Sequence, residues 1–351
     1  MNIAIMTIQS VNYGNRLQNY ALQSILEERG HYVESLRRDS GFHGPFQSKL
    51  RMVKRKLGLL KHRNDKIGAF RRFDSSYVSF SYARVSTEYT CSDLANCYDC
   101  FVIGSDQVWN PDFCFNSDLE YLPMVPIEKK IAYAASFGVN NIEKGCERTA
   151  ELLNGIKHIS VREAAGADII NKLTDRRVPV VLDPTLLLSP EKWDKISEKP
   201  LTVECTEPYA FKYVLGDDVN NRRIQELASS CGLRVIDVMD ESFAIGPSEF
   251  VWLIAHSCLV CTDSFHASVF ALLYRKPLAI FERVSADADM SSRFDTLCSN
   301  FGLVGHRSTE EAFGKEAIFD TDWNLVHSRL TAMRDSSLSW LDNALDGVEH
   351  G

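Results

Sequence analysis

The residues from Cys258 to Tyr274, CLVCTDSFHASVFALLY, combine an apolar run with a polar turn and a histidine. The run is typical of a buried strand that passes directly into a helix with His266 in its first turn. The N–H groups of a helix N-terminus attract anions, and in open α/β sheets ligands bind beyond the carboxyl ends of strands. An imidazole placed there could meet a phosphate or a carboxylate. The alternative is an N-cap followed by a core histidine.

Other polar residues also follow apolar runs, and their types suit acid–base chemistry and anion binding. Asp106 follows the run CFVIG, and the pair Arg162 and Glu163 follows the run HISV. Asp183 precedes a proline and is interpreted as the cap of a turn. Polar groups in equivalent places are Asn12 to Arg16, Ser105, Ser136 to Gly138, and Ser264. Because parallel strands bring their carboxyl ends to one edge of a sheet, we expect these groups to converge there.

The elements that must position these residues alternate between strand and helix. Strands are predicted at 3–8, 31–36, 100–104, 130–135, 158–161 and 178–182, with helices at 16–29 and 147–156. In the second half, strands are predicted at 209–215, 233–237, 258–262 and 277–281, with helices at 220–230, 248–255 and 265–274. Such alternation, with right-handed crossovers, builds a parallel sheet covered by helices. The sequence therefore predicts an α/β protein.

Length and proline content predict two domains, since 351 residues can supply two ordinary cores. A stretch rich in charge and proline suits a linker between them. We predict an N-terminal Rossmann-like domain at 1–189, a linker at 190–208, a C-terminal Rossmann-like domain at 209–322, and a C-terminal helix and tail at 323–351. The two domains are expected to face one another across a cleft, and the C-terminal helix to cross back to the first domain.

Charge and hydropathy narrow the possible partners. A net charge of −8 argues against a general affinity for nucleic acid. No apolar run is long enough to span a bilayer, and the first residues lack the features of a signal peptide, so a cytoplasmic protein is expected. Residues 49–72 are strongly basic and interleaved with apolar residues. This segment is either a peripheral contact with the inner face of an anionic membrane or a solvated helical excursion of the N-terminal domain.

Motifs for cofactors and metals are missing from the sequence. Neither GxGxxG nor GxxxxGK[ST] occurs, which disfavours bound NAD or a P-loop nucleotide. The acidic residues are scattered, without a DxD pair or a His/Glu cluster, so no metal is predicted. Cys258 and Cys261 have CxxC spacing, but strand alternation would point them to opposite faces. We therefore predict no cofactor, and buried free thiols rather than a thiol site.

Seven segments, taken in order, resemble the polysaccharide pyruvyl transferase family. They are NYGNRLQNYALQ (12–23), VIGSDQVWNP (102–111), YAASFG (133–138), SVREAAG (160–166), VLDPTLLL (181–188), YVLGD (213–217) and TDSFHASVFALLYRKPLAIF (262–281). The ordered series, which spans roughly Asn2 to Leu303, is more specific than any one segment. The resemblance implies two Rossmann-like domains arranged as in GT-B glycosyltransferases. It also implies phosphoenolpyruvate as donor, a sugar or lipid-linked glycan with two hydroxyls as acceptor, and a pyruvate ketal as product.

The resemblance also implies roles for the donor side. Arg162 is the candidate clamp for the phosphate or carboxylate, because a guanidinium can hold either anion in a bidentate fork; a surface arginine at a helix start is the alternative. His266 could give a proton to the donor or bridge its phosphate, since imidazole titrates near neutral pH. Ser264 completes the donor side of this segment, and Arg293 is added as a second anion ligand because the sequence SSRF follows the last clear strand of the second domain. Ala267 departs from the glycine that the family often has, and its methyl could narrow the donor pocket.

On the acceptor side, Asp106 is expected to take a proton from the attacking hydroxyl. The residues expected to bind the sugar are Asn12, Asn15, Gln107, Trp109 and Asn110. A Trp109 face would pack well on a pyranose, although a tryptophan in the core fits the sequence equally well. Two other functions remain open. One is a GT-B glycosyltransferase that uses a nucleotide sugar, and the other is an inactive glycan-binding relative.

Overall fold

The N-terminal half forms a parallel sheet in which the first strands are added outward on one side of the centre and the later strands on the other side. The computed structural model describes residues 1–38, 66–85, 94–113, 116–216, 218–283 and 291–350, and within them this sheet has six strands in the order β3-β2-β1-β4-β5-β6. The strands are β1 (Asn2–Met6), β2 (Tyr32–Arg38), β3 (Phe80–Val85), β4 (Cys100–Ile103), β5 (Lys130–Ala135) and β6 (His158–Val161). Every residue of β4 and β5 is buried, as expected for parallel strands covered on both faces.

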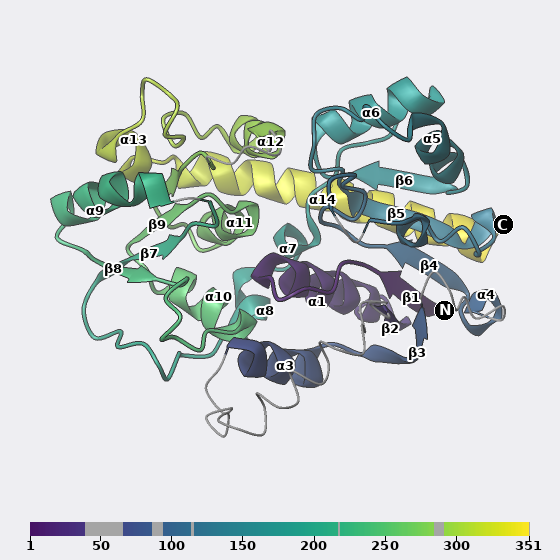
Figure 1. The fold of residues 1–351 in the computed structure, drawn as a ribbon, viewed down its shortest axis with the longest axis horizontal. Helices are drawn as coiled ribbons and strands as arrows, with labels where there is room; N and C mark the ends of the chain where they lie inside the picture. Colours follow the sequence, from purple (N-terminus) through teal and green to yellow (C-terminus); the bar gives the residue numbers. More distant parts are fainter. Residues whose placement is uncertain (39–65, 86–93, 114–115, 217, 284–290, 351) are drawn as a thin grey trace, which may run out of the picture.

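Helices cover both faces of this first sheet (Figure 1). They are α1 (Tyr13–Glu27), α3 (Lys66–Tyr77), α4 (Leu94–Cys97), α5 (Cys146–Asn154), α6 (Ala164–Thr174) and α7 (Pro184–Leu187), with 3₁₀ turns at Asp118–Tyr121 and Ile127–Lys129. The helix predicted from residue 16 begins three residues earlier. The reason is the Asn12 side chain, which accepts a hydrogen bond from the Asn15 N–H and so caps the helix.

The C-terminal half forms a second parallel sheet of four described strands, in the order β10-β9-β7-β8. The strands are β7 (Tyr209–Tyr213), β8 (Arg234–Asp237), β9 (Leu259–Thr262) and β10 (Leu278–Ile280). The helices are α9 (Asn221–Ser230), α10 (Pro247–Ala255), α11 (Phe265–Leu273), α12 (Ser291–Phe301) and α13 (Lys315–Phe319), with a 3₁₀ turn at Asp218–Asn220. The strands alternate with helices as predicted. Two Rossmann-like units therefore face one another, which is the GT-B arrangement.

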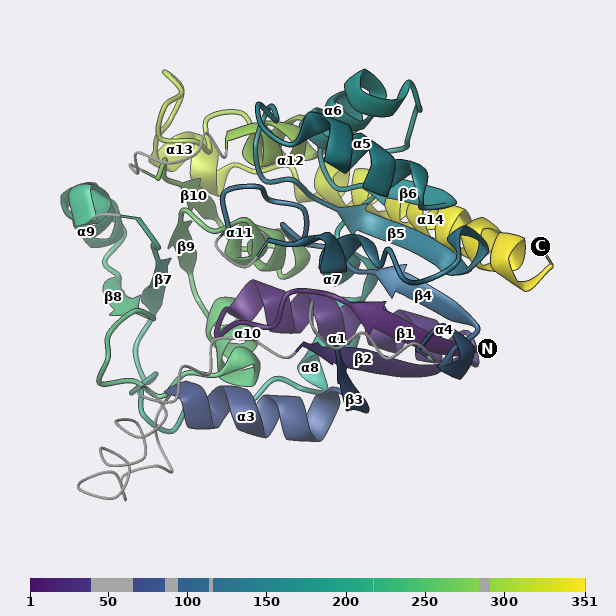
Figure 2. The ribbon, with the colours of Figure 1, turned by 45° about the vertical axis from the view of Figure 1, so that its right-hand side comes forward.

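The two domains share a continuous hydrophobic core. Tyr13 of α1 stacks on Phe250 of α10 with ring centroids 4.3 Å apart, and its hydroxyl donates to the Ile245 carbonyl at 3.1 Å. The last helix, α14 (Trp323–Glu349), runs along both domains in Figures 1 and 2. Its Ser337 hydroxyl accepts a hydrogen bond from the Leu182 N–H at 3.0 Å. The crossing back of the C-terminal helix is therefore as predicted.

Two sequence predictions need correction. Residues 178–182 do not form a strand, because they pair with β6 only through an isolated bridge between Val180 and Val161, and Pro179 cannot donate to a ladder. The predicted linker 190–208 contains a short helix, α8 (Pro190–Asp194), whose Trp193 is fully buried. That indole packs on Phe270, with ring centroids 4.8 Å apart. The linker is thus partly a core segment.

The basic segment predicted at 49–72 is only partly described. Residues 49–65 lie outside the described part of the chain, and residues 66–72 form the first turns of α3. No helix among the described residues has the length and apolar character needed to cross a membrane.

Candidate active site

A cavity of about 230 Å³ lies where the two domains meet. It is lined by Ile8, Ser10, Asn12, Asn15, Asp106, Gln107, Phe113, Leu215, Ser264, Phe265, His266, Arg283 and Arg293. These residues follow β1 and β4 in one sheet and β7, β9 and β10 in the other. The neighbours β1 and β4, and likewise β7 and β9, mark the point where each sheet reverses its strand order, and crevices at such points bind ligands in open α/β sheets. We call this space the central cavity.

Two helices begin at the central cavity, one from each domain. Asn12 caps α1 and Ser264 is the N-cap residue of α11, and both line the cavity. The Ser264 side chain makes no capping hydrogen bond. The first N–H groups of a helix have no partner within the helix, and the helix dipole places partial positive charge at this end. Two helix starts that converge on one cavity favour an anion within it.

His266 lies between the two domains, in contact with α1. A Cβ atom built on Gly14 would come within 2.0 Å of His266 Nδ1, so the imidazole packs directly on the backbone of that helix. Its Nε2 lies 3.5 Å from Asp183 Oδ2, beyond good hydrogen-bond distance, and has no hydrogen-bond partner among the described residues. Sequence reasoning placed His266 at this edge, and the structure shows it lining the cavity.

Asp183 organises the floor beneath this histidine. Its Oδ1 accepts from the Thr185 N–H at 3.0 Å, so it caps α7 as predicted. Its Oδ2 accepts from the Ser105 hydroxyl at 2.9 Å and from Arg162 Nη1 at 3.0 Å. Burial raises the pKa of Asp183, but His266, Arg162 and Thr185 outweigh burial and hold the pKa well below its usual range. Sequence reasoning missed this second role, although Asp183 belongs to the VLDPTLLL segment.

Arg162 is not a wall of the central cavity, which corrects its placement as an anion clamp. Its side chain is only 1% exposed and lies among three carboxylates, with Asp183 at 3.0 Å, Glu163 at 3.4 Å and Asp106 at 3.5 Å. Its Cζ also lies 4.5 Å from the centroid of the Phe265 ring. Burial lowers the pKa of the guanidinium, but the three carboxylates together raise it. The Arg162 side chain therefore lies among acidic groups and not in the wall of the cavity, and its role in the reaction stays a prediction.

The cations that reach the cavity are Arg293 and Arg283. Arg293, named from the sequence as a donor ligand, comes from the first turn of α12 and lines the cavity. Burial lowers its pKa to about 10, and Arg162 and Arg283 add to this effect. Arg283 was missed, although a cation three residues beyond the end of β10 was a usable signal. Its Nε lies 3.1 Å from Asp263 Oδ2, which fixes it at the rim.

Asp106 and Asn15 bring acceptor-side groups to the same cavity. Asp106 has a φ of +72°, a conformation that is uncommon for residues other than glycine and recurs at functional sites. Its Oδ2 accepts a hydrogen bond from the Asn15 amide, and its Oδ1 faces Arg162. Both residues, with Asn12 and Gln107, line the cavity as the sequence predicted. Their individual roles remain predictions.

Trp109 and Asn110 do not line the central cavity, which corrects the sugar platform expected from them. The Trp109 indole is buried in the core, stacked on Tyr121 with ring centroids 5.2 Å apart and close to Phe137 at 5.3 Å. It has no free face for a sugar. Asn110 donates to Gln107 Oε1 at 2.7 Å and so shapes the loop that presents Gln107.

The methyl group of Ala267 does not narrow the central cavity. Ala267 is fully buried within the hydrophobic core and is not among the cavity's lining residues. Among the described residues, no cluster of three or more His, Cys, Asp or Glu side chains could hold a metal ion. The lining residues themselves supply arginines and helix N-termini for anion binding, and an imidazole and a carboxylate for proton transfer.

A family comparison agrees with this arrangement. The sequence profile described as "Polysaccharide pyruvyl transferase" matches residues 12–283, well over half of the chain. The chain belongs to the polysaccharide pyruvyl transferase family. The matched residues include most of the cavity lining, from Asn12 to Arg283, but not Ile8, Ser10 or Arg293. A search of curated proteins found no match.

Solved structures of other proteins are similar to this pyruvyl transferase family member only in outline. An uncharacterised protein from Klebsiella pneumoniae is 10% identical over 84% of this chain and 87% of its own, with a TM-score of 0.45. UDP-GlcNAc 2-epimerase from Neisseria meningitidis is 9% identical over 98% and 99%, with a TM-score of 0.46. ADP-heptose LPS heptosyltransferase II from E. coli is 12% identical over 96% and 99%, with a TM-score of 0.38.

Proposed function

We propose that the protein transfers the pyruvyl group of phosphoenolpyruvate onto two hydroxyls of a sugar in a polysaccharide or glycan-lipid precursor. The observation that carries the proposal is the central cavity itself. It combines two helix N-termini, two arginines and an imidazole with a carboxylate on the opposite domain. A small dianion next to a hydroxyl-bearing sugar matches this distribution of charge.

Donor binding rests on the C-terminal domain. Phosphoenolpyruvate carries a phosphate and a carboxylate, and Arg293 and Arg283 can each face one of these groups. The start of α11, at Ser264, supplies N–H groups for the phosphate oxygens. A nearby anion stabilises the charged form of a buried guanidinium whose pKa is lowered by burial. Arg293 is therefore the stronger candidate of the two arginines for a donor ligand.

Proton transfer rests on His266 and Asp106, which line the central cavity from different domains. His266 delivers a proton to C3 of the donor, which gives C2 cationic character and makes it open to attack. Asp106 accepts the proton of the first sugar hydroxyl as its oxygen bonds to C2. The C2–O bond to phosphate then breaks, the second hydroxyl adds to C2, and its proton leaves with inorganic phosphate. The product is a ketal with a methyl group.

The test is turnover of the purified protein with phosphoenolpyruvate and a panel of sugar acceptors, with the ketal detected by mass spectrometry and phosphate release measured in parallel. We expect acceptor-dependent phosphate release. His266→Gln and Arg293→Gln should each lower it by about 10²- to 10³-fold while the proteins remain folded, because each variant removes a proton carrier or an anion ligand. Arg293→Gln should in addition weaken donor binding.

A matched control is His256→Gln, since His256 is an exposed histidine at the end of α10, away from the cavity lining. It should leave turnover unchanged. Thermal stabilisation by a nucleoside diphosphate but not by phosphoenolpyruvate would contradict the proposal and favour a nucleotide-sugar glycosyltransferase. Saturable glycan binding without any donor binding would instead favour an inactive glycan-binding relative.

A further inference from the structure

A second cavity, of about 500 Å³, lies in the N-terminal domain beside the β1–α1 loop. Its wall carries the five arginines Arg16, Arg37, Arg38, Arg71 and Arg84, together with Asp74, Gln9, Ser75, Val78 and Phe80. We call it the arginine pocket. The chain as a whole has a net charge of −8, so a wall with five arginines and one carboxylate runs counter to its composition, even though Glu120 pairs with Arg38. A concave surface of one charge sign raises the local concentration of oppositely charged ligands.

The parallel sheet brings these arginines together from distant parts of the sequence. Arg37 and Arg38 are the last residues of β2, and Arg84 lies opposite Arg37 in β3. Arg16 comes from the first turns of α1, and Arg71 comes from α3. Four elements thus place guanidiniums around one space at the carboxyl edge of the sheet, which is the edge where α/β sheets bind ligands.

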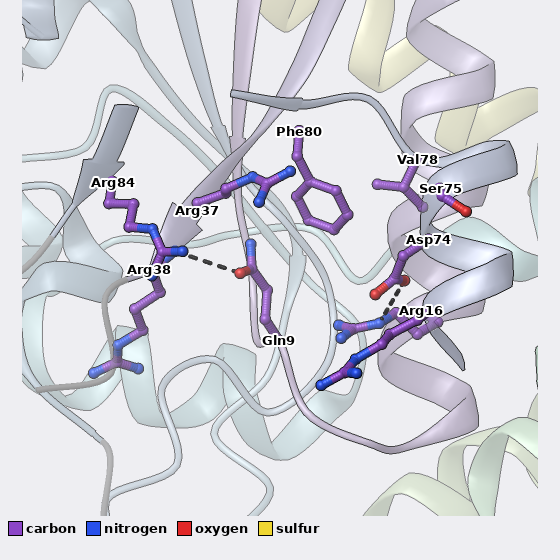
Figure 3. Close-up of a pocket in the computed structure, with 10 residues that line it drawn as sticks. Gln9, Arg16, Arg37, Arg38, Asp74, Ser75, Val78, Phe80 and Arg84 are labelled. Atoms are coloured by element: carbon purple, nitrogen blue, oxygen red, sulfur yellow. Dashed lines mark hydrogen bonds and ion pairs between the residues drawn. The ribbon is translucent and has the colours of Figure 1, made fainter. Parts of the chain in front are cut away.

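Arg16 is the most deeply buried of the five arginines in the pocket wall. Its Nε lies 2.8 Å from Asp74 Oδ1, yet its buried Nη1 has no hydrogen-bond partner among the described residues. Burial lowers the pKa of Arg16 even though Asp74 opposes that change. Figure 3 shows Arg16 and Asp74 on one side of Gln9. A ligand anion would satisfy the buried N–H groups and compensate the desolvated charge.

The two arginines opposite Arg16 differ in their partners. Figure 3 shows Arg37 and Arg38 across Gln9 from Arg16. Arg38 is paired with Glu120, but Arg37 lies over the Phe80 ring, with Cζ 5.2 Å from the ring centroid. Within the described chain, Arg37 has no carboxylate at ion-pair distance, and the same holds for the exposed Arg71. These two guanidiniums are therefore open to a ligand.

The chemistry of the wall specifies the ligand class. Guanidiniums bind phosphate oxygens in bidentate pairs, which is why arginine clusters are typical of phosphate recognition. The volume falls in the range of small-molecule sites and exceeds the needs of one phosphate. Several guanidiniums around such a space suit a group with more than one phosphate.

The arginine pocket and the central cavity are both lined by the short segment 9–16, which leads from β1 into the first turn of α1. Gln9 and Arg16 line the pocket, whereas Ser10 and Asn15 line the cavity. In the sheet, β2 and β3 are the next two strands beyond β1. With strands ~4.8 Å apart, the two spaces are separated by roughly 5–10 Å along the edge. An extended ligand that occupied both spaces would have to cross about this distance.

We propose that the arginine pocket binds a diphosphate group carried by the acceptor, whose sugar then reaches into the central cavity. This inference rests on the proposed pyruvyl transfer for the role of the ligand, but not for its binding. The shared chemistry is a sugar diphosphate ester, whether the diphosphate is attached to a nucleoside or to a lipid.

Binding is tested by isothermal titration of the purified protein with inorganic pyrophosphate and, separately, with phosphoenolpyruvate. In Arg37→Gln/Arg71→Gln, pyrophosphate binding should weaken at least tenfold while phosphoenolpyruvate binding is unchanged. Arg293→Gln should show the reverse pattern. The matched control is Arg148→Gln/Arg222→Gln, which removes two exposed arginines outside both cavities and should change neither titration.

Pyrophosphate binding that survives in Arg37→Gln/Arg71→Gln, or that phosphoenolpyruvate displaces competitively, would overturn the inference. If phosphoenolpyruvate binds nowhere, the proposed function fails while the pyrophosphate titration still decides this site. The acceptor arm compares a neutral sugar, its nucleoside diphosphate ester and its short-chain prenyl diphosphate ester. A preference for either ester supports the inference and identifies the carrier, provided that Arg37→Gln/Arg71→Gln removes this preference by raising the KM for the ester. Equal turnover of the neutral sugar contradicts it.

Discussion

At the scale of single residues, the site depends on a close approach between a glycine and a histidine from different domains. Gly14 belongs to the first turn of α1, and a Cβ there would overlap His266 Nδ1. Glycine in a helix is unfavourable by roughly 0.5–1 kcal/mol relative to alanine. Glycine is therefore needed at position 14 because a side chain would overlap the imidazole. It is not needed for an unusual backbone conformation.

Gly14→Ala should destabilise the wild-type protein by about 1–3 kcal/mol, because the added methyl must displace the imidazole from a packed position. In a His266→Ala background the same change should be neutral or stabilising by up to about 1 kcal/mol, since the helix then gains a better helix former. Urea unfolding of the four proteins measures this double-mutant cycle. Equal effects of Gly14→Ala in both backgrounds would show that the two residues are not in contact.

The Asp183 carboxylate is the residue whose ionisation should matter most for stability. Its folded pKa lies below the ordinary value of 3.8, so its contribution is fully present above that value and is lost as the pH falls below it. Asp183→Asn should cost about 3–5 kcal/mol at neutral pH, because it leaves Arg162 short of a buried partner. Denaturant unfolding at several pH values measures the difference from wild type.

That difference should shrink progressively as the pH falls below about 5, because the unfolded wild-type chain then takes up a proton at Asp183 that the folded protein still excludes, whereas the variant has no such proton to bind. A difference that stays constant down to the acid end would mean that the carboxylate is not held in its charged form. Asp168→Asn is a suitable control, because Asp168 is an exposed residue of α6 outside the lining of the central cavity.

At the scale of elements, α8 shows how a segment rich in proline and charge becomes part of the core. Pro190 opens the helix, and Trp193 lies one turn further on, facing inward. The indole packs on Tyr20 of α1 and Phe270 of α11, with ring centroids 5.6 and 4.8 Å away, and its Nε1 donates to the Thr185 carbonyl at 3.2 Å. This short helix therefore fastens the connection to both domains.

Trp193→Ala should lower the free energy of unfolding by about 3–5 kcal/mol, because it removes a large buried side chain and leaves a cavity. Leu201→Ala, at a 98% exposed position in the same connecting segment, should change it by no more than about 0.5 kcal/mol. Guanidinium unfolding of both variants provides the measurement. Similar small effects at the two positions would mean that residues 190–208 behave as a solvated linker after all.

At the scale of the whole molecule, the two Rossmann-like units are joined by more than a linker. The hydrophobic core continues from α1 through α10 and α11, and α14 packs along both units (Figure 2). Domains that share a large apolar interface are not expected to unfold independently. The central cavity, which takes its lining from both units, is held in shape by the same contacts.

Unfolding should therefore be one cooperative transition. We expect the denaturant curves followed by tryptophan fluorescence and by far-ultraviolet circular dichroism to coincide. Removal of residues 323–351 should separate them, because α14 contributes buried residues to the core, including Leu330 and Leu341. Two transitions in the intact chain would show that the domains are energetically independent.

The sequence by itself determined the kind of fold and the edge at which function is sought. Alternation of apolar runs with periods near 2 and 3.6 is a local property, so most strands and helices, and the polar groups that follow them, could be predicted. His266, Asp106 and Arg293 were found in this way. The strand predicted at 178–182 was wrong, because an apolar run indicates that a segment is buried but does not show which strand it pairs with.

Only the tertiary structure decided which of these polar groups reach the ligand. Arg162 lies behind the central cavity among carboxylates, Trp109 lies in the core, and Arg283 reaches the rim. The direction of a side chain depends on register and on packing between segments far apart in the chain, and local periodicity does not contain that information. The arginine pocket shows the same principle, because Arg16 and Arg71 become neighbours only once α1 and α3 pack at the sheet edge.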